Sequence, residues 1–165
     1  MVIRRASIVL AALGLSSCGG TSAPSSKCGP STATVANVVD GDTIELTDGQ
    51  KIRYLLVDAP EITKGHNDCY GQEAAKFNTQ MVAGQTIELR YDEAGCTDKY
   101  GRLLAYVSVG GVEVNARLVE RGYACVLYLP PAGDARQIEF KKLESTARSN
   151  GAGVWGACNP VTCAQ

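Results

Sequence analysis

The chain has 165 residues, of which 45% are hydrophobic and 20% are charged. A chain of this length fits one domain with a substantial core, and this composition excludes an intrinsically disordered protein. The formal net charge is −1. Proteins that bind nucleic acid tightly and nonspecifically usually carry a basic surplus, so any anion-binding site here must be local.

The N-terminus has the pattern of an export signal. A basic lead, "MVIRR", precedes the apolar run "ASIVLAALGL", which is too short to span a bilayer. The next four residues, "LSSC", resemble the lipobox of bacterial lipoproteins and imply cleavage before Cys18 and acylation of its sulfur. Ordinary signal-peptidase cleavage at the same small residues is the alternative. We therefore predict a signal peptide over 1–17 and an exported protein, either secreted or anchored to the bacterial cell envelope through Cys18.

Six further cysteines follow the lipobox: Cys28, Cys69, Cys96, Cys125, Cys158 and Cys163. In an exported chain this number suggests up to three disulfides, and the spacing leaves their pairing open. A zinc site is disfavoured because the sequence has no Cys-x-x-Cys, and the sole histidine, His66, has no partner at ligand spacing.

The first half of the chain reads as a tether followed by short strands. Residues 18–31 are rich in Gly, Ser and Pro and predict a flexible tether, which leaves one domain over 32–165. Within this domain "TATVANVV" at 32–39 predicts a strand. Asp-Gly turns then flank the short strand "TIEL" and precede the strand "KIRYLLVDA" at 51–59.

The second half alternates helices and strands. An apolar face on 71–82 predicts a helix, "QTIELRYD" a strand, and "LLAYVSVGGVEVN" a hairpin across its Gly-Gly pair. A short helix around "NARLVERG", an extended "YACVLYLPP" and a last helix over 134–149 complete the chain. In the last helix we expect Ile138, Leu143 and Ala147 to be buried.

The order of these elements favours an α+β, mainly β fold. Five short strands with helices suggest a small, partly closed antiparallel barrel of OB type with three helices packed on it. Element order alone does not separate this barrel from another α+β arrangement.

Two clusters of carboxylates fall at predicted strand ends. Asp40 and Asp42 lie in "VVDGDT", and Asp58 and Glu61 lie around Pro60 in "VDAPE". Hard cations such as calcium bind several oxygens from carboxylates and backbone carbonyls. Each cluster by itself is also compatible with a purely structural turn, because Asp-Gly pairs are common turn formers.

Two arginines make a catalytic interpretation coherent. Arg53 opens the strand that ends at the second carboxylate cluster, and Arg102 follows Gly101 in "TDKYGR". Hydrolysis of a phosphodiester needs donors where negative charge develops on phosphorus, and arginines supply paired donors. A surface ion pair is the alternative for either residue.

Several motifs together resemble the staphylococcal nuclease family. "VVDGDTIEL", "IRYLLVDAPE", "YGQEAAKF", "TDKYGRLLAYV", "VNARLVERGYACV" and the late "VW" stand in the order and spacing of that family over about residues 33–156. The resemblance implies an OB-fold barrel with three helices and calcium-dependent cleavage of DNA and RNA. It also implies attack of water on phosphorus to leave 3′-phosphate ends.

The resemblance implies a role for each matching site residue. Asp42 and Asp58 would bind Ca²⁺ through their carboxylates, and Ala59 through its backbone carbonyl, although the best-known member has threonine at this position. Glu61 would orient or deprotonate the attacking water. Arg53 and Arg102 would hold the phosphate and stabilise the transition state, whereas Asp40 would shape the turn that presents Asp42.

Three further positions match residues that contact the nucleotide in this family. Lys99, Tyr100 and Tyr128 would bind the substrate, and a tyrosine can stack on a base. Pro130 stands where the best-known member has a second tyrosine, which weakens the expected stacking.

We also expect two disulfides, one of them at this site. Cys69 and Cys96 flank the loops of the proposed site, and we expect them to pair and stiffen these loops. Cys158 and Cys163 are close enough in sequence to form a second pair.

The sequence therefore predicts a monomeric, exported, calcium-dependent nuclease of DNA and RNA. Two alternatives belong to other functional classes. One is a noncatalytic OB-fold lipoprotein that binds nucleic acid or an envelope partner, and the other is a structural scaffold in the envelope. Modules that have lost activity typically lack the acids and arginines that are present here.

Overall fold

The computed structural model describes residues 26–163, so the predicted signal peptide and Cys18 lie outside the described residues. Within this range no helix has the length and apolar character needed to cross a membrane.

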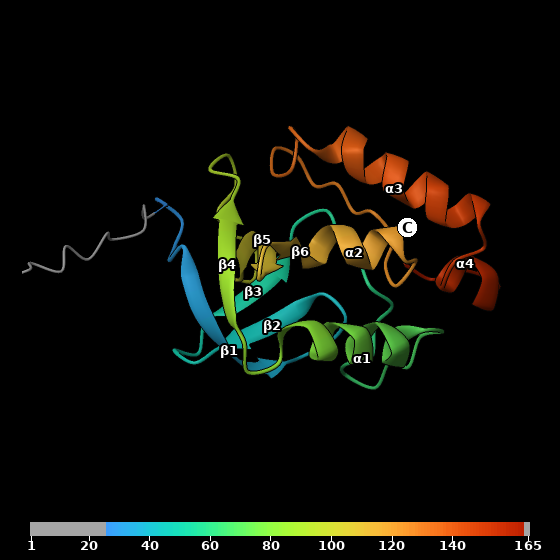
Figure 1. Cartoon of the computed structure of the whole chain (residues 1–165), viewed down its shortest axis with the longest axis horizontal. Helices are drawn as coiled ribbons and strands as arrows, with labels where there is room; N and C mark the ends of the chain where they lie inside the picture. The colour runs from blue at the N-terminus through green and yellow to red at the C-terminus, as the bar shows by residue number, and fades with distance from the viewer. Residues whose placement is uncertain (1–25, 164–165) are drawn as a thin grey trace, which may run out of the picture.

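Five strands of the described residues close into a mixed barrel (Figure 1). They are β1 (Thr32–Val38), β2 (Thr43–Leu46), β3 (Lys51–Tyr54), β4 (Thr86–Tyr91) and β5 (Leu103–Val109). The sheet runs in the order β3-β2-β1-β4-β5, and β3 also pairs with β5. The predicted five-stranded OB-type barrel is thus confirmed.

The barrel differs from the prediction in one respect, because it is closed by a parallel pair. Ile52 lies opposite Leu103, and Tyr54 lies opposite Ala105, in parallel register, whereas the other ladders are antiparallel. A parallel pair needs a long crossover between its strands, and here α1 and β4 provide it. Alternation along the sequence identifies a strand but not the strand that pairs with it.

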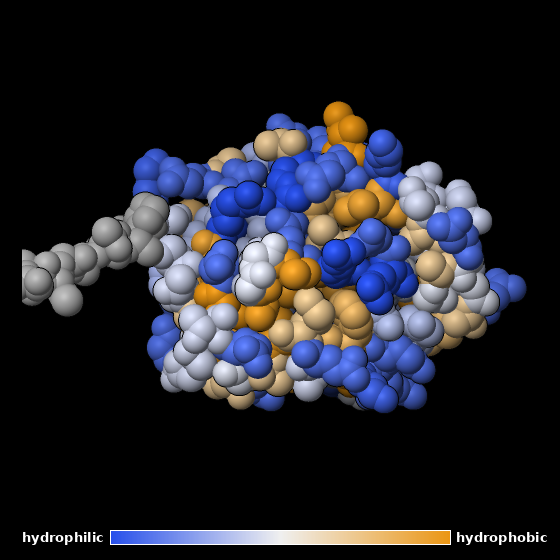
Figure 2. Space-filling view, in the orientation of Figure 1, coloured by the Kyte–Doolittle hydropathy of each residue, from blue (hydrophilic) through white to orange (hydrophobic). Residues whose placement is uncertain are grey.

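The main helices cover the barrel from one side and below in Figure 1. Their bounds are α1 (Gly71–Val82), α2 (Val114–Glu120) and α3 (Gln137–Ser149), and the two-residue β6 (Val112–Glu113) and the short α4 (Val154–Ala157) complete the elements. Polar side chains cover most of the margin of the face seen in Figure 2 and leave an apolar area near its centre.

The C-terminal third corrects the start of the last helix and the burial of one of its residues. The segment 123–131, expected to be extended, forms no named strand and makes only isolated bridges. The last helix begins at Gln137, and Ile138 is 82% exposed, whereas Phe140 is fully buried. Phe140, Leu143 and Ala147 follow the spacing of one helical stripe, and Ile138 lies off that stripe.

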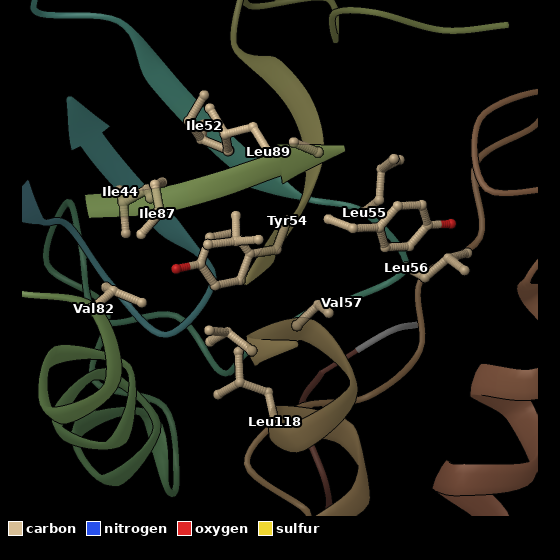
Figure 3. Close-up of a cluster of buried hydrophobic side chains, with 14 of the residues drawn as sticks. Ile44, Ile52, Tyr54, Leu55, Leu56, Val57, Val82, Ile87, Leu89 and Leu118 are labelled. Carbon is tan, nitrogen blue, oxygen red and sulfur yellow. The ribbon is translucent and has the colours of Figure 1, made fainter. Parts of the chain in front are cut away.

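A buried tyrosine links the barrel core to the turn before β2. Tyr54 is packed among the aliphatic residues of the core, with its hydroxyl directed toward α1 (Figure 3). This hydroxyl donates to Asn78 Oδ1 at 2.8 Å, and Asn78 Nδ2 donates to the Asp40 carbonyl at 3.0 Å. Because both polar groups are buried and satisfied, they fix α1 against this turn.

Candidate active site

The turn between β1 and β2 presents the first carboxylate. Asp40 Oδ1 accepts the amide hydrogen of Asp42 at 3.0 Å, which makes Asp40 the structural residue of the turn, as expected. Gly41 between them has no room for a side chain, because a Cβ would lie 2.5 Å from Ala59 Cβ and 2.8 Å from Ala74 Cβ. The glycine therefore lets Asp42 approach the segment that carries Ala59.

Arg53 joins the two carboxylates that were predicted to bind metal. Its Nε lies 3.2 Å from Asp42 Oδ1, and its Nη2 lies 2.8 Å from Asp58 Oδ1. Its Nη1 donates to the carbonyls of Tyr54 and Val57. The predicted strand 51–59 ends at Tyr54, and the chain that follows bends around this guanidinium, so that Asp58 returns to the same site.

The environment of Asp42 suits a bound cation. Asp42 is only 5% exposed, and burial raises the pKa of its carboxyl to about 6, even though Arg53 acts in the opposite direction. Its Oδ1 accepts the Thr43 hydroxyl at 3.0 Å, and its Oδ2 accepts the Ala59 amide at 2.7 Å. A cation beside this carboxylate would favour its ionised form, so the chemistry of the donors fits calcium.

The described residues contain no group of three or more His, Cys, Asp or Glu side chains placed to hold a metal ion. A calcium ion here would therefore rely on Asp42, Asp58, the Ala59 carbonyl and water. Calcium sites commonly include backbone carbonyls and water among their oxygen ligands.

Glu61 is held in a tight loop. Its Oε1 accepts the amides of Ile62 at 2.9 Å and Thr63 at 2.7 Å, and the Thr63 hydroxyl at 2.7 Å. Partial burial would raise the pKa of Glu61, but these hydrogen bonds outweigh it and lower the pKa below its ordinary value. Asp68 closes the loop, since its amide donates to the Glu61 carbonyl and its Oδ2 accepts the Glu61 amide. Glu61 is therefore an ionised carboxylate at neutral pH.

Arg102 is oriented by a carboxylate four residues before it. Its Nε donates to Asp98 Oδ2 at 2.7 Å, and its amide donates to Asp98 Oδ1 at 3.0 Å. Its Nη1 donates to the Thr43 hydroxyl at 3.5 Å. Because Thr43 also donates to Asp42, this hydroxyl connects Arg102 with the first carboxylate. Gly101 precedes it with φ of 79°, a conformation that favours glycine.

One pocket of about 360 Å³ collects almost all the predicted site residues. Those that line it are Asp42, Arg53, Asp58, Ala59, Glu61, Lys99, Tyr100 and Arg102. Tyr128 is not among the lining residues; its hydroxyl donates to Asp134 at 2.7 Å, while its neighbours Leu127 and Leu129 line the pocket. The fold thus brings together residues that are separated by up to 60 positions in the sequence, from Asp42 to Arg102.

Comparison with known proteins identifies the family of the chain. A family model described as "Staphylococcal nuclease homologue" matches residues 51–157, which is more than half of the chain. The chain belongs to the staphylococcal nuclease family.

The relatives in this nuclease family include proteins named as nucleases. The SPbeta prophage-derived endonuclease YokF of Bacillus subtilis (strain 168) is 40% identical over 135 residues, which cover 78% of this chain and 45% of that protein. Endonuclease YncB of the same organism is 39% identical, over 78% of this chain and 64% of its own length. Thermonuclease of Staphylococcus intermedius is 35% identical over 73% of this chain and 74% of its own length.

The family and fold predictions are confirmed, whereas the site roles remain predictions. The chain spans less than two thirds of the first two nuclease relatives. The family match begins at residue 51, so the Asp40–Asp42 turn precedes it. What links this turn to the matched region is the contact of Asp42 with Arg53 and Ala59.

The predicted disulfide pairings are wrong. Cys69 pairs with Cys158 instead of Cys96, and Cys96 pairs with Cys28. Cys163 pairs with Cys125 instead of Cys158. Each bond crosses at least 38 positions, because the folded chain brings its terminal segments against the site loops.

Sequence reasoning also missed residues that support the candidate site. The i, i+4 spacing of Asp98 and Arg102 could have indicated their pairing, since such pairs are neighbours in tight local structure. Thr43 and Asp68 gave no such signal. Thr162 and Cys163 line the pocket from the far end of the chain, and no local pattern predicts this position.

Proposed function

We propose that this member of the nuclease family is a calcium-dependent phosphodiesterase that cleaves DNA and RNA. The observation that carries the proposal is the shared pocket, in which two arginines and an ionised glutamate lie beside two carboxylates. Nuclease relatives support the same class of substrate.

Each side chain has a distinct task in the proposed reaction. Arg53 and Arg102 bind the phosphate oxygens and stabilise the charge that develops during attack. Glu61 accepts a hydrogen bond from the attacking water and orients it toward phosphorus. The water oxygen bonds to phosphorus as the bond from phosphorus to the 5′-oxygen breaks. The water loses a proton to solvent and the 5′-oxygen takes one up from solvent, which leaves a 3′-phosphate and a 5′-hydroxyl. Calcium, held by Asp42, Asp58 and the Ala59 carbonyl, would neutralise charge on the phosphate.

The lowered pKa of Glu61 defines its part in this scheme. A carboxylate with a lowered pKa stays ionised and is a weaker base, so its main contribution is to orient the water. The bonds from Thr63 and Ile62 occupy Oε1, and among the described residues Oε2 receives no hydrogen bond. Oε2 is therefore the oxygen that we assign to the water.

The test uses oxidised protein with single-stranded DNA, duplex DNA and RNA, each with calcium and with calcium chelated. We expect calcium-dependent cleavage with 3′-phosphate products, and loss of about 10²-fold in turnover in Glu61→Gln. Glu73→Gln is the matched control, because Glu73 is exposed on α1 outside the pocket. A folded protein that binds these nucleic acids but cleaves none of them would instead be a noncatalytic binding module.

Export and lipid anchoring belong to the same proposal. Three disulfides in the described residues are typical of an oxidising compartment. We propose cleavage before Cys18 and acylation of its sulfur. Mass spectrometry of the mature N-terminus, compared with a Cys18→Ala variant, tests this directly: an unmodified Cys18, or a mature N-terminus elsewhere, would contradict the anchor.

A further inference from the structure

A second pocket adjoins the candidate active site. It has a volume of about 430 Å³ and shares Asp40, Glu61, Tyr100 and Arg102 with the first. Because four lining residues are common to both, the two pockets are parts of one groove that passes Arg102 and Glu61. The second part is lined by two lysines, Lys51 and Lys64, to which no role has been assigned above.

Lys51 is placed by the same strand that carries Arg53. Ile52 and Tyr54 are buried in the barrel, whereas Lys51 is exposed and Arg53 lies partly exposed between them. Side chains alternate along a strand, so Lys51 and Arg53 share one face, with their Cα atoms roughly 6.6 Å apart. The strand β3 therefore presents a second positively charged side chain, that of Lys51, to the groove two residues before Arg53.

Lys64 reaches the same pocket from the Glu61 loop. The hydrogen bonds from Thr63 to Glu61 fix the residue that immediately precedes Lys64. The side chain of Lys64 is exposed and lines the pocket together with Lys51 and Thr63. Two separate elements thus present one ammonium group each to this part of the groove.

Both ammonium groups are available for a ligand. Within residues 26–163 the ammonium groups of Lys51 and Lys64 form no hydrogen bond or ion pair, whereas Arg53 and Arg102 are paired with aspartates. Glu45 lies opposite Lys51 in the β2–β3 ladder without an ion pair between them. The carboxylates of this pocket, Asp40 and Glu61, lie at its boundary with the catalytic part.

We propose that Lys51 and Lys64 form a second phosphate-binding site, which takes the backbone phosphate of the nucleotide next to the scissile bond. This inference rests on the proposed nuclease function. A polynucleotide that places one phosphate between Arg53 and Arg102 continues along the groove past Lys51. The two lysines supply local electrostatic attraction that the net charge of −1 does not provide.

The test compares Lys51→Gln/Lys64→Gln with the matched control Lys76→Gln/Lys142→Gln in oxidised protein. The control lysines are exposed on α1 and α3 and line neither pocket. Cleavage of a single-stranded 20-nucleotide DNA is measured over a salt series. Neutralising one phosphate contributes about 0.7 to the salt slope for single strands, and the two lysines share one phosphate, so we expect the magnitude of the slope of log(kcat/KM) to fall by about 0.7 in the test variant only.

A dinucleoside monophosphate provides the second substrate, because it has one phosphodiester and no neighbouring phosphate. We expect the test variant to cleave it as the control does. Equal losses on both substrates, or an unchanged salt slope on the 20-mer, would overturn the proposal.

A binding measurement separates this proposal from the nuclease assignment. Fluorescence anisotropy of a labelled 20-mer with calcium chelated reports affinity without cleavage. If the wild type cleaves neither substrate, the nuclease proposal fails. The lysine site is then supported by a lower salt slope of binding in the test variant and refuted by equal slopes in both variants.

Discussion

Arg53 makes more contacts in the site than any lysine could. Its guanidinium meets Asp42 and Asp58 from separate nitrogens and also donates to the Val57 carbonyl. A planar group with several donors in fixed directions can satisfy these partners at once, whereas an ammonium group offers three donors from one atom. The side chain is 12% exposed, so water replaces few of these bonds.

We therefore predict that Arg53→Lys lowers turnover by about 10²-fold. It should also lower the free energy of unfolding by up to about 3 kcal/mol, because the buried Asp42 loses its partner. Cleavage kinetics and urea unfolding measure the two effects. Arg121→Lys, at an exposed position, is the control and should leave both unchanged. Full activity in Arg53→Lys would remove Arg53 from the proposed phosphate site.

Asp98 makes a pH-dependent contribution to stability. Burial would raise the pKa of its carboxyl, but hydrogen bonds from Arg102 and Tyr100 outweigh burial and lower it below the ordinary 3.8. The ionised form is thus favoured in the folded state. Its contribution is fully present above the unfolded pKa and is lost as the pH falls through the folded pKa.

We expect Asp98→Asn to destabilise the protein by a constant amount above about pH 5. The difference from wild type should shrink below about pH 4, as the wild-type carboxyl becomes protonated. Urea unfolding from pH 3 to 7 measures this. If the difference in unfolding free energy between Asp98→Asn and wild type did not change with pH, the negative charge of Asp98 would contribute nothing to stability. The variant should also lower turnover, because Asp98 orients Arg102.

At the scale of elements, the disulfides connect terminal segments to the loops of the site. Cys28 is bonded to Cys96, which stands two residues before Asp98. Cys163 is bonded to Cys125, whose backbone exchanges two hydrogen bonds of 2.9 Å with Asp58.

The third disulfide, Cys69–Cys158, acts on the Glu61 loop. Cys69 follows Asp68, which closes that loop by hydrogen bonds to Glu61. Each crosslink therefore restrains a different group of the pocket.

We predict that a dithiol reductant lowers turnover by about tenfold or more, since misplaced catalytic groups lose much of their effect. Reoxidation should restore it. Removing single crosslinks separates the effects. Cys125→Ser/Cys163→Ser should weaken calcium affinity through Asp58, whereas Cys28→Ser/Cys96→Ser should lower turnover through Arg102. Far-UV circular dichroism checks that each variant folds. A reduced, folded protein with full activity and unchanged calcium affinity would contradict this prediction.

At the scale of the whole molecule, one ligand should stabilise the entire barrel. Asp42 and Asp58 come from different sides of the β2–β3 hairpin, so a cation held between them would tie the hairpin to the segment that follows it. A ligand that binds only the folded state raises its stability by an amount set by its concentration relative to Kd.

We expect calcium at about 100 times its Kd to raise the free energy of unfolding by about 2.7 kcal/mol. Asp42→Asn should abolish this increase, and Glu73→Gln should keep it. Thermal unfolding with and without calcium provides the measurement. The site assignment would be wrong if Asp42→Asn retained the full calcium effect.

The charge of the molecule also has its main consequence at this scale. A net charge of −1 gives little general attraction to a polyanion. Attraction to a polyanion must therefore come from a local cluster of positively charged side chains. The groove contains such a cluster, formed by Arg53, Arg102, Lys51 and Lys64.

The sequence by itself determined the helices and most strands and, through the motifs it shares with a known family, the family, the barrel and the candidate site residues. Short-range patterns suffice for the elements, because strand alternation at 51–54 and the apolar stripe at 71–82 depend on neighbouring residues alone. The motifs around Asp42, Asp58 and Arg102 were recognisable because each places its chemistry within a few residues of a strand end.

Only the tertiary structure decided the contacts between distant segments. The parallel closure of β3 on β5 and the disulfides each join residues at least 38 positions apart, and Cys163 reaches a pocket that is also lined by Asp42 and Arg102. The exposure of Ile138 was also decided by the tertiary structure. Which face of a helix is buried depends on where the helix begins and on what it packs against. The spacing of residues in the sequence does not predict which distant segments come into contact, because these contacts are set by how the whole barrel packs.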